Sequence, residues 1–510
     1  MSTAVSSAQR RSRLTLVLSV GFLLATLPPL GAAHAEIVSG TQQELEAQLL
    51  AAVQSAHFEN AIDFGPFEDV CPGAHFCPVP APTVSQRPEK VPNVDVAVIE
   101  LDAKGNATRA ADVLLSRDYP KAVVVPIDQA SGPAGSWGVS AVRWRRWDID
   151  RYNGGTWDQH TGAQLSVKGW TDNPPLTGDD DIIPGRQSAP LQFMAPYPAS
   201  LFKLIVAFRI MRLVDMGRVS LDQLYSWDPT ATIEAQGNVP DLPFHAGSSP
   251  AHDTETKAVR DWMDAMVTYS DNDSARALLK LLWDLNDLPA MHDELRALGL
   301  GTLQINGTDP ATGRLWYPGQ IHMTSMDTAR LLWLVDGGDG TLWTRPDGTP
   351  VRASLLSNSS RAYLKSLLGD YAFNEALSTS NFCGAPNTRP GIPALVPSRW
   401  VNADGTVTAG GYPYGHDVRP CQATAGVTFA HKTGLTFNYG SDAGIVRSLP
   451  GKQGRHYVIS FISSLGYRYV DPVFASATSY PCYESVGAIC YTQRIPALGK
   501  QVDDYLKATP

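Results

Sequence analysis

The amino-acid sequence predicts a mixed α+β fold. Three observations predict it: an apolar strand pattern at 94–101, a series of helical segments between residues 200 and 368, and a return to short apolar strands and a closing helix after residue 427. This order of elements is typical of an α+β domain or of a three-layer sandwich. With 510 residues and 43% hydrophobic content, the chain can bury a substantial core.

Hydrophobic periodicity predicts each element in turn. Residues 94–101 are partly alternating and run into the turn-forming 102–106, so we expect a strand there. Ser200 opens a helix whose apolar face continues to Gly217, a residue that suits a helix end. Further helices are expected at 258–266, 273–282, 326–335, 362–368 and 499–507, and further strands at 427–431, 443–447 and 455–463.

The first 35 residues have the pattern of a cleavable signal peptide. A basic segment, Arg10–Arg13, precedes an apolar stretch at 14–30, and residues 33–35 read Ala-His-Ala. The adjacent arginines partly match a twin-arginine export signal. Pro28 and Pro29 shorten the apolar stretch below the roughly 20 residues that span a membrane, which argues against an uncleaved anchor. We therefore expect a secreted, periplasmic or cell-envelope protein.

Charge and cysteine content limit the classes of partner. A net charge of -9 without long runs of either sign excludes a nucleic-acid-binding surface. Six cysteines in an exported chain indicate disulfides, for which 15 pairings exist. Closure of short loops favours Cys71 with Cys77 and Cys482 with Cys490, which leaves Cys383 with Cys421. Neither short pair has zinc-ligand spacing, and we expect no metal and no cofactor.

Composition divides the mature chain into an extension and a core with two insertions. Residues 36–92 form an N-terminal extension with a helix at 43–53 and a proline-rich part. The core spans 93–510, with insertions at about 109–187 and 376–426. The first insertion holds five tryptophans, which indicate either a sugar- or peptide-binding surface or packing onto the core, and we favour packing. Its cluster 179–181 is read as a solvated acidic loop rather than a calcium site.

Ser200 and Lys203 form the first of three motifs that carry chemistry. Spaced three apart at a helix start, their side chains project from one face, so the amine can reach the hydroxyl. A lysine with a lowered pKa activates a serine nucleophile by taking its proton. The positive end of the helix favours the developing oxyanion. Alone, this spacing is expected about once by chance in a chain this long, and a helix cap with a solvated lysine would be the favoured interpretation.

Two later tripeptides change that balance. Ser270-Asp271-Asn272 precedes a helix, where a second hydroxyl can relay a proton, although such residues also cap helices. Lys432-Thr433-Gly434 ends an expected strand and can present a cation and a hydroxyl to a carboxylate, or form an ordinary turn. Each tripeptide occurs by chance in about one of ten chains this long, so all three motifs in this order favour catalysis.

The ordered trio resembles the penicillin-recognising serine enzymes, namely class A β-lactamases and related D,D-peptidases. Segment 94–101 looks like the family's first strand, Phe202 stands where class A enzymes usually have Phe, and 217–222 and 324–329 are similar to further family segments. The resemblance covers roughly two thirds of the mature chain. It implies a three-layer α/β/α sandwich with an antiparallel sheet and a helical subdomain.

The resemblance also implies roles for single residues. Ser200 would be the acylated nucleophile, Lys203 its base, and Ser270 the proton shuttle, with Asn272 and Lys432 completing the catalytic set. The substrate would be bound by four consecutive residues, Thr433, Gly434, Leu435 and Thr436, with the substrate carboxylate on Lys432 and Thr433 and the oxyanion on the backbone N–H groups of Ser200 and Leu435.

One part of the family pattern is missing. Class A enzymes carry a Glu-x-x-Leu-Asn motif whose glutamate activates the deacylating water, and the corresponding stretch, 303–310, offers only Asp309. Asp309 is a candidate replacement, but its place before Pro310 favours a structural turn. His431, which precedes the lysine triplet, is interpreted as a wall of the site rather than a catalyst.

The sequence therefore predicts an exported serine hydrolase that opens a β-lactam or related amide or ester, a β-lactamase activity of the kind that gives antibiotic resistance. A D,D-carboxypeptidase or esterase on cell-wall-type substrates is the alternative enzyme. A non-catalytic protein that binds a cell-wall ligand is the alternative outside enzymes. We expect a monomer that takes a small-molecule β-lactam or a peptidoglycan-type substrate and associates with the cell wall.

Overall fold

A six-stranded antiparallel sheet organises the computed structural model, which describes residues 41–63, 91–128, 135–146, 181–228, 254–313, 320–385, 388–436, 439–466, 469–470 and 494–508. The strand order is β15-β16-β17-β2-β3-β4, and every neighbouring pair is antiparallel. The predicted α+β class is confirmed. The strands are β2 Val94–Leu101, β3 Ala107–Leu115, β4 Val123–Val124, β15 Val427–Leu435, β16 Gly440–Ser448 and β17 His456–Ser463.

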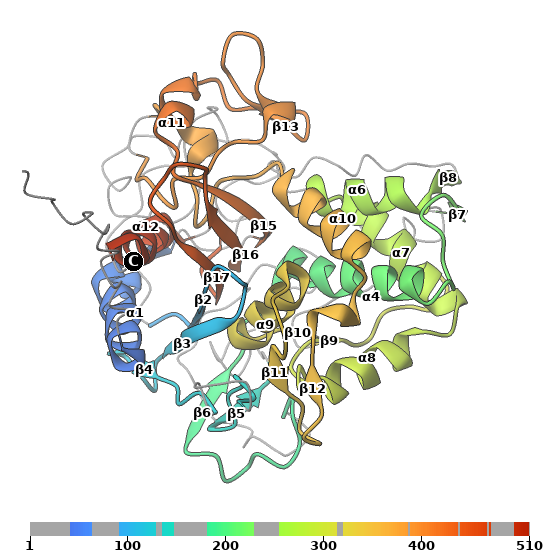
Figure 1. Cartoon of the computed structure of the whole chain (residues 1–510), viewed down its shortest axis with the longest axis horizontal. Coiled ribbons are helices and arrows are strands. Elements are labelled where there is room, and N and C mark those ends of the chain that lie inside the picture. Colours follow the sequence, from blue (N-terminus) through green and yellow to red (C-terminus); the bar gives the residue numbers. More distant parts are fainter. Residues whose placement is uncertain are drawn as a thin grey trace, which may run out of the picture. The chain divides into compact units, whose positions relative to one another are not determined.

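Helices cover both faces of this sheet (Figure 1). On one face, α1 (Gln42–Ala56) and α12 (Arg494–Ala508) share a core with Val94, Val96 and Val98 of β2. On the other face, Ala97 and Ile99 belong to the core that contains α9 (Ser325–Asp336) and α4 (Lys203–Asp215). Side chains of successive strand residues point to opposite faces, so a strand covered on both sides is mostly apolar, as β2 is apart from Asp95 and Glu100.

Four helices, α6, α7, α8 and α10, build a helical region beside the sheet. The remaining described helix, α11, belongs to the second insertion. Because α10 contacts α4, α6 and α9 as well as β15, it links this region to the edge strand of the sheet. The bounds are α6 Val259–Thr268, α7 Asn272–Asp284, α8 Leu288–Ala297, α10 Asn358–Gly369 and α11 Arg419–Thr424.

Short strand pairs and 3-10 turns complete the described residues. The pairs are β1 Ile62–Asp63 with β18 Tyr469–Val470, β5 Val142–Arg145 with β6 Leu191–Met194, β7 Leu224–Trp227 with β8 Glu255–Ala258, β9 Gln304–Ile305 with β10 Ile321–His322, β11 Trp343–Thr344 with β12 Pro350–Val351, and β13 Thr408–Ala409 with β14 Tyr412–Pro413. The 3-10 turns are η1 Phe58–Asn60, η4 Ala199–Phe202, η5 Ala353–Leu355, η6 Ser380–Phe382 and η7 Ser398–Trp400.

The first insertion contributes to the core where the structure describes it. Trp137 and Trp144 are buried, as expected for packing tryptophans, whereas the tryptophans at 147, 157 and 170 lie outside the described residues. The acidic cluster is described only at Asp181, and there the solvated-loop interpretation is wrong. Asp181 is buried and pairs with Arg143 at 2.8 Å and Arg145 at 3.2 Å, because a buried carboxylate requires cationic partners.

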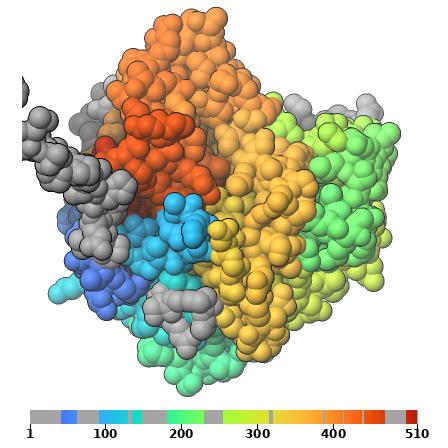
Figure 2. Space-filling model, in the orientation of Figure 1, coloured from blue at the N-terminus to red at the C-terminus, as the bar shows by residue number. Residues whose placement is uncertain are grey.

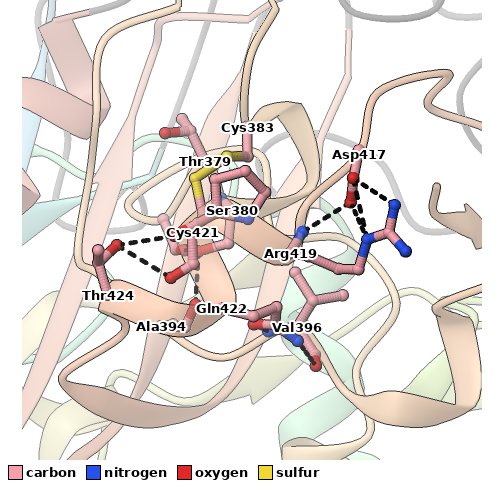
Figure 3. Close-up of a disulfide and its surroundings, with 12 residues drawn as sticks. Thr379, Ser380, Cys383, Ala394, Val396, Asp417, Arg419, Cys421, Gln422 and Thr424 are labelled. Atoms are coloured by element: carbon pink, nitrogen blue, oxygen red, sulfur yellow. Dashed lines mark hydrogen bonds and ion pairs between the residues drawn. A yellow bond between two sulfur atoms is a disulfide. The ribbon is translucent and has the colours of Figure 1, made fainter. Parts of the chain in front are cut away.

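A disulfide joins the two ends of the second insertion (Figure 3). Cys383 and Cys421 are bonded, which confirms this predicted pair, while the other four cysteines lie outside the described residues. Nearby, Gln422 accepts from Val396 N–H and donates to its carbonyl, each at 2.8 Å. In Figure 2 the insertion (orange) adjoins the amber residues that include α10 on the surface shown.

The signal-peptide residues 1–35 lie outside the described part of the chain. Among the residues that the structure describes, none of the helices combines the length and the apolar character needed to cross a membrane.

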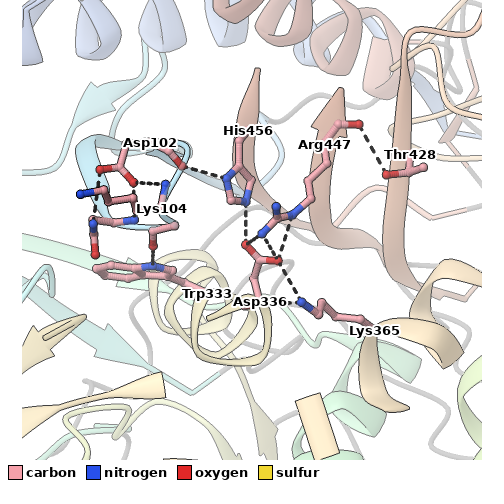
Figure 4. A network of polar contacts seen from close by, with 10 residues as sticks. Asp102, Lys104, Trp333, Asp336, Lys365, Thr428, Arg447 and His456 are labelled. Atoms are coloured by element: carbon pink, nitrogen blue, oxygen red, sulfur yellow. Dashed lines mark hydrogen bonds and ion pairs between the residues drawn. The ribbon is translucent and has the colours of Figure 1, made fainter. Parts of the chain in front are cut away.

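Asp336 ties the end of α9 to three other elements (Figure 4). Its carboxylate accepts two hydrogen bonds of 2.8 Å from Arg447 of β16 and one of 2.6 Å from His456 of β17. Lys365 of α10 lies 3.8 Å away. These partners lower the pKa of Asp336 against the opposing effect of burial.

We expect Asp336→Asn to destabilise the fold by about 2–3 kcal/mol, because it leaves Arg447, His456 and Lys365 without their shared carboxylate. The shift of the urea unfolding midpoint measures this loss. The matched control is Asp339→Asn, an exposed acid just beyond α9, which should change stability by less than about 0.5 kcal/mol. Equal midpoints for the two variants would contradict the role given to Asp336.

Candidate active site

Ser200 lies on the 3-10 turn that leads into α4, and Lys203 is the first residue of that helix. The Lys203 Nζ atom is 3.2 Å from Ser200 Oγ, so the predicted contact between amine and hydroxyl is present. Ala199, just before the serine, has φ of 49°, a left-handed conformation that L-residues rarely adopt. Such local strain is typical of functional turns, and here it lies at the first residue of the turn that carries Ser200.

Ser270 lies in the junction between α6 and α7, also with a positive φ, of 60°. Asp271 caps α7 by accepting a 2.6 Å hydrogen bond from Ser274 N–H, which is the helix-cap role. Asn272 and Ser270 instead face Lys203: Asn272 Oδ1 accepts from Lys203 Nζ at 2.8 Å, and the Ser270 carbonyl accepts from the same amine. The tripeptide therefore serves both as a cap and as part of the site.

The third motif lies on β15, the edge strand of the sheet. Lys432 Nζ donates to Ser270 Oγ at 2.7 Å, which joins the strand to the helical region. Gly434 passes so close to the nucleophile turn that an added Cβ would lie 2.7 Å from Leu201 N and closer still to the Pro198 carbonyl. Only glycine fits this approach, so the third residue of the motif sets the distance between strand and nucleophile.

Burial sets the electrostatics of the two lysines. Both side chains are 0% exposed, and desolvation lowers the pKa of Lys203 to about 7. The pKa of Lys432 is lowered well below its usual value, first by desolvation and then by the charge of Lys203. At neutral pH, Lys203 therefore exchanges readily between its charged and neutral forms, as a general base requires.

Hydrogen-bond geometry indicates what neutral Lys203 can do. A neutral amine has two N–H donors and one lone pair, and the Ser270 carbonyl and Asn272 Oδ1 take the two donors. The remaining lone pair can accept from Ser200 Oγ–H at 3.2 Å. The site can therefore deprotonate Ser200 at the moment of attack.

Ser270 Oγ stands between the two amines, 3.3 Å from Lys203 Nζ and 2.7 Å from Lys432 Nζ. A hydroxyl that accepts from Lys432 keeps its own proton for another acceptor. This position suits a shuttle that passes a proton between Lys203 and a leaving group.

Tyr371 is a site residue that the sequence analysis missed. It follows α10, and its hydroxyl lies 3.2 Å from Lys432 Nζ and within hydrogen-bonding distance of Thr433 Oγ1. Tyr371 and Thr433 are both buried. This tyrosine belongs to none of the three motifs. The sequence signal for it was its position three residues after the predicted helix 362–368.

His431 is buried behind the site, as expected for a wall residue. Its Nδ1 lies 2.7 Å from Asp442 Oδ1, and its ring stacks on Phe429 at a centroid distance of 4.0 Å. The ring also meets Tyr371 edge-on at 4.9 Å. His431 therefore packs against the ring of Tyr371 and helps to fix its position.

Two predicted residues lie in turns. Asp309 accepts from Ala311 N–H at 2.9 Å and from Thr312 Oγ1 at 2.8 Å, the contacts of a turn-forming aspartate. Thr436 accepts from Tyr439 N–H at 3.1 Å in the β15–β16 hairpin. Leu435 is buried in the core shared with α1 and α12. The water-activating role of Asp309 stays a prediction, and its carboxylate is engaged within its own turn.

Comparison with protein families gives one match. Residues 195–379 match the family described as the beta-lactamase enzyme family. The matched range contains Ser200, Lys203, Ser270 and Tyr371, and it ends before β15. None of the curated proteins matches the chain.

Comparison with solved structures also gives matches. One is an acyl-enzyme complex of a PBP-A mutant with penicillin G, with 17% identity, a TM-score of 0.37 and coverage of 61% of this chain and 83% of the other. Another is a beta-lactamase from Chitinophaga pinensis, with 16% identity, a TM-score of 0.36 and coverage of 62% and 86%.

We expect acylation of Ser200 to depend on pH with a midpoint near 7. A lysine with a pKa of about 7 is charged below that pH and neutral above it, so the rate should rise about tenfold per unit below the midpoint and level off above it. The measurement is the second-order rate of acylation by benzylpenicillin between pH 5.5 and 9, followed by intact mass. A flat profile, or a rise that continues beyond pH 9, would exclude Lys203 as the base.

Proposed function

We propose that the chain, a serine β-lactamase-like hydrolase whose residues 195–379 match the beta-lactamase enzyme family, forms an acyl-enzyme at Ser200 in the manner of class A β-lactamases. The observation that carries the proposal is the set of contacts around Lys203, which joins Ser200, Ser270 and Asn272 at one buried amine. Its substrate class is a β-lactam or a related amide or ester.

The proposed reaction has two half-steps. Ser200 Oγ attacks the acyl carbon while Lys203 takes the hydroxyl proton, and this proton passes through Ser270 to the nitrogen or oxygen that leaves. The carbon–heteroatom bond breaks, and the acyl group remains on Ser200 as an ester. Water then cleaves this ester, which releases the acid and restores the serine hydroxyl.

The second half-step is the slow one in this proposal. The region that carries the water-activating glutamate in class A enzymes has only Asp309, whose carboxylate accepts two hydrogen bonds from its own turn. Activation of the deacylating water would therefore need a base other than Asp309. This observation favours the second candidate function, a D,D-carboxypeptidase or esterase on cell-wall-type substrates, over a fast β-lactamase.

Incubation with benzylpenicillin should add the mass of one penicilloyl group to the wild-type protein and none to Ser200→Ala. We expect the adduct to persist for at least an hour, because each oxygen of the Asp309 carboxylate already accepts a hydrogen bond from within its own turn. Intact mass spectrometry over time gives both formation and release. The absence of any adduct together with the absence of penicillin turnover would overturn acylation at Ser200, and release within seconds would favour the fast β-lactamase.

We also propose that the protein is exported and acts as a monomer at the cell envelope. The basic, apolar and Ala-His-Ala segments of residues 1–35 support export, and a disulfide between Cys383 and Cys421 is typical of oxidising compartments.

Expression in a secreting host should therefore yield a mature chain that begins at Glu36, because signal peptidases cleave after an A-x-A pattern. N-terminal sequencing of the exported protein gives the start. A change of Ala33 and Ala35 to bulky residues should leave the segment attached. Export of an uncleaved wild-type chain would contradict the cleavage site.

A further inference from the structure

Tyr371 occupies the position between Lys432 and Thr433 at the edge of the site. Its hydroxyl is 3.2 Å from Lys432 Nζ and within hydrogen-bonding distance of Thr433 Oγ1. The exposed fractions of Tyr371, Lys432 and Thr433 are 0%, 0% and 1%. A cationic amine and a hydroxyl side by side form an anion-binding pair, but here both groups already contact a phenol from their own chain.

Lys432 has no hydrogen-bond donor left for a substrate. Its three donor directions are used by Ser270 Oγ at 2.7 Å, the Thr433 carbonyl at 2.8 Å and the Tyr371 hydroxyl. An ammonium group has three N–H bonds, and a neutral amine has two. A substrate carboxylate could therefore reach Lys432 only by displacing one of these partners.

The backbone around Tyr371 is fixed by contacts from three directions. Ala372 N–H donates to the Thr268 carbonyl at 3.0 Å, at the end of α6. Asn381 donates to the Ala372 carbonyl at 2.7 Å, and Trp400 donates to the Asp370 carbonyl at 2.9 Å. Both donors come from the second insertion. Displacement of the tyrosine would break this set of buried hydrogen bonds together.

The ring of Tyr371 is fixed as well. Lys432 Nζ lies 4.5 Å from the ring centroid, in cation–π geometry. Phe373 and His431 meet the ring edge-on at 5.6 Å and 4.9 Å. The phenol thus fills its place by packing as well as by hydrogen bonding.

Two acids are buried behind Tyr371. Asp442 is buried beside His431, and Glu375 is buried and accepts from Tyr414 at 3.1 Å. Both acids lie close enough to act electrostatically on Lys432. Burial raises the pKa of Glu375 to about 8. Acidic groups of the chain itself therefore already lie near Lys432 before any substrate binds.

We propose that Tyr371 takes the place of a substrate carboxylate as the partner of Lys432 and Thr433, so that the enzyme selects acyl donors that are uncharged at this position. The proposal rests on acylation at Ser200 and narrows its substrate class to neutral esters and amides. Tyr371 acts here as a specificity-determining residue, and the second insertion is the part of the chain that keeps it in place.

The test compares two acyl donors that differ only in the carboxylate, benzylpenicillin and its methyl ester. The second-order rate of Ser200 labelling is measured for each by intact mass, and the ratio of the acid rate to the ester rate is the readout. We expect a ratio at or below 1 for the wild-type protein. In Tyr371→Phe, which keeps the ring and removes the hydroxyl, Lys432 and Thr433 become available and the ratio should rise at least tenfold.

Tyr457→Phe is the matched control, because it removes another buried hydroxyl, bonded to Asp503 at 3.0 Å between β17 and α12. Its ratio should equal that of the wild type. A wild-type preference for the acid of more than tenfold, or a change of less than threefold in Tyr371→Phe, would overturn the proposal while leaving acylation intact. Absence of labelling by both donors would overturn acylation itself, and the proposal with it.

Discussion

Two buried lysine amines that share the hydroxyl of Ser270 are the constraint on which the rest of the site depends. Lys203 Nζ and Lys432 Nζ lie 3.3 Å and 2.7 Å from Ser270 Oγ, and both amines are completely buried. Burial of one lysine already disfavours its charge, and a second cation nearby disfavours it further. Oxygen atoms must therefore accept hydrogen bonds from each amine to offset its loss of water.

The fold supplies these oxygens by bringing three segments together at the edge of the sheet: the turn at Ser200, the junction between α6 and α7, and β15. The α6–α7 junction provides Ser270 and Asn272, and β15 provides the Thr433 carbonyl. Strained backbone at Ala199 and Ser270, together with the absence of a side chain at Gly434, allows the three segments to come this close. Stability of the packed layers, including the Asp336 network, holds the segments in place.

Short motifs made much of this arrangement predictable, since each contains its own spacing and turn chemistry. The turn and helix start at Ser200 and Lys203, the cap at Asp271 and the strand that ends at Leu435 are local features, and the sheet strands followed from their periodicity. Tyr371 was not predictable, because its role arises only when α10 packs against β15. Asp181 was misread for a similar reason: its arginine partners, Arg143 and Arg145, lie nearly 40 residues earlier in the chain.

The second insertion gives the site a property that the three motifs do not contain. Arg399 in this insertion pairs with Asp264 of α6 at 3.3 Å and lies over the rings of Tyr269 and Trp400. Tyr269 directly precedes Ser270. The Trp400 side chain donates a hydrogen bond to the carbonyl of Asp370, the residue before Tyr371. The insertion thus contacts the residue before Ser270 and the residue before Tyr371. If Tyr371 has the proposed role, a change in this insertion alters substrate choice at Lys432 without touching Ser200 or Lys203.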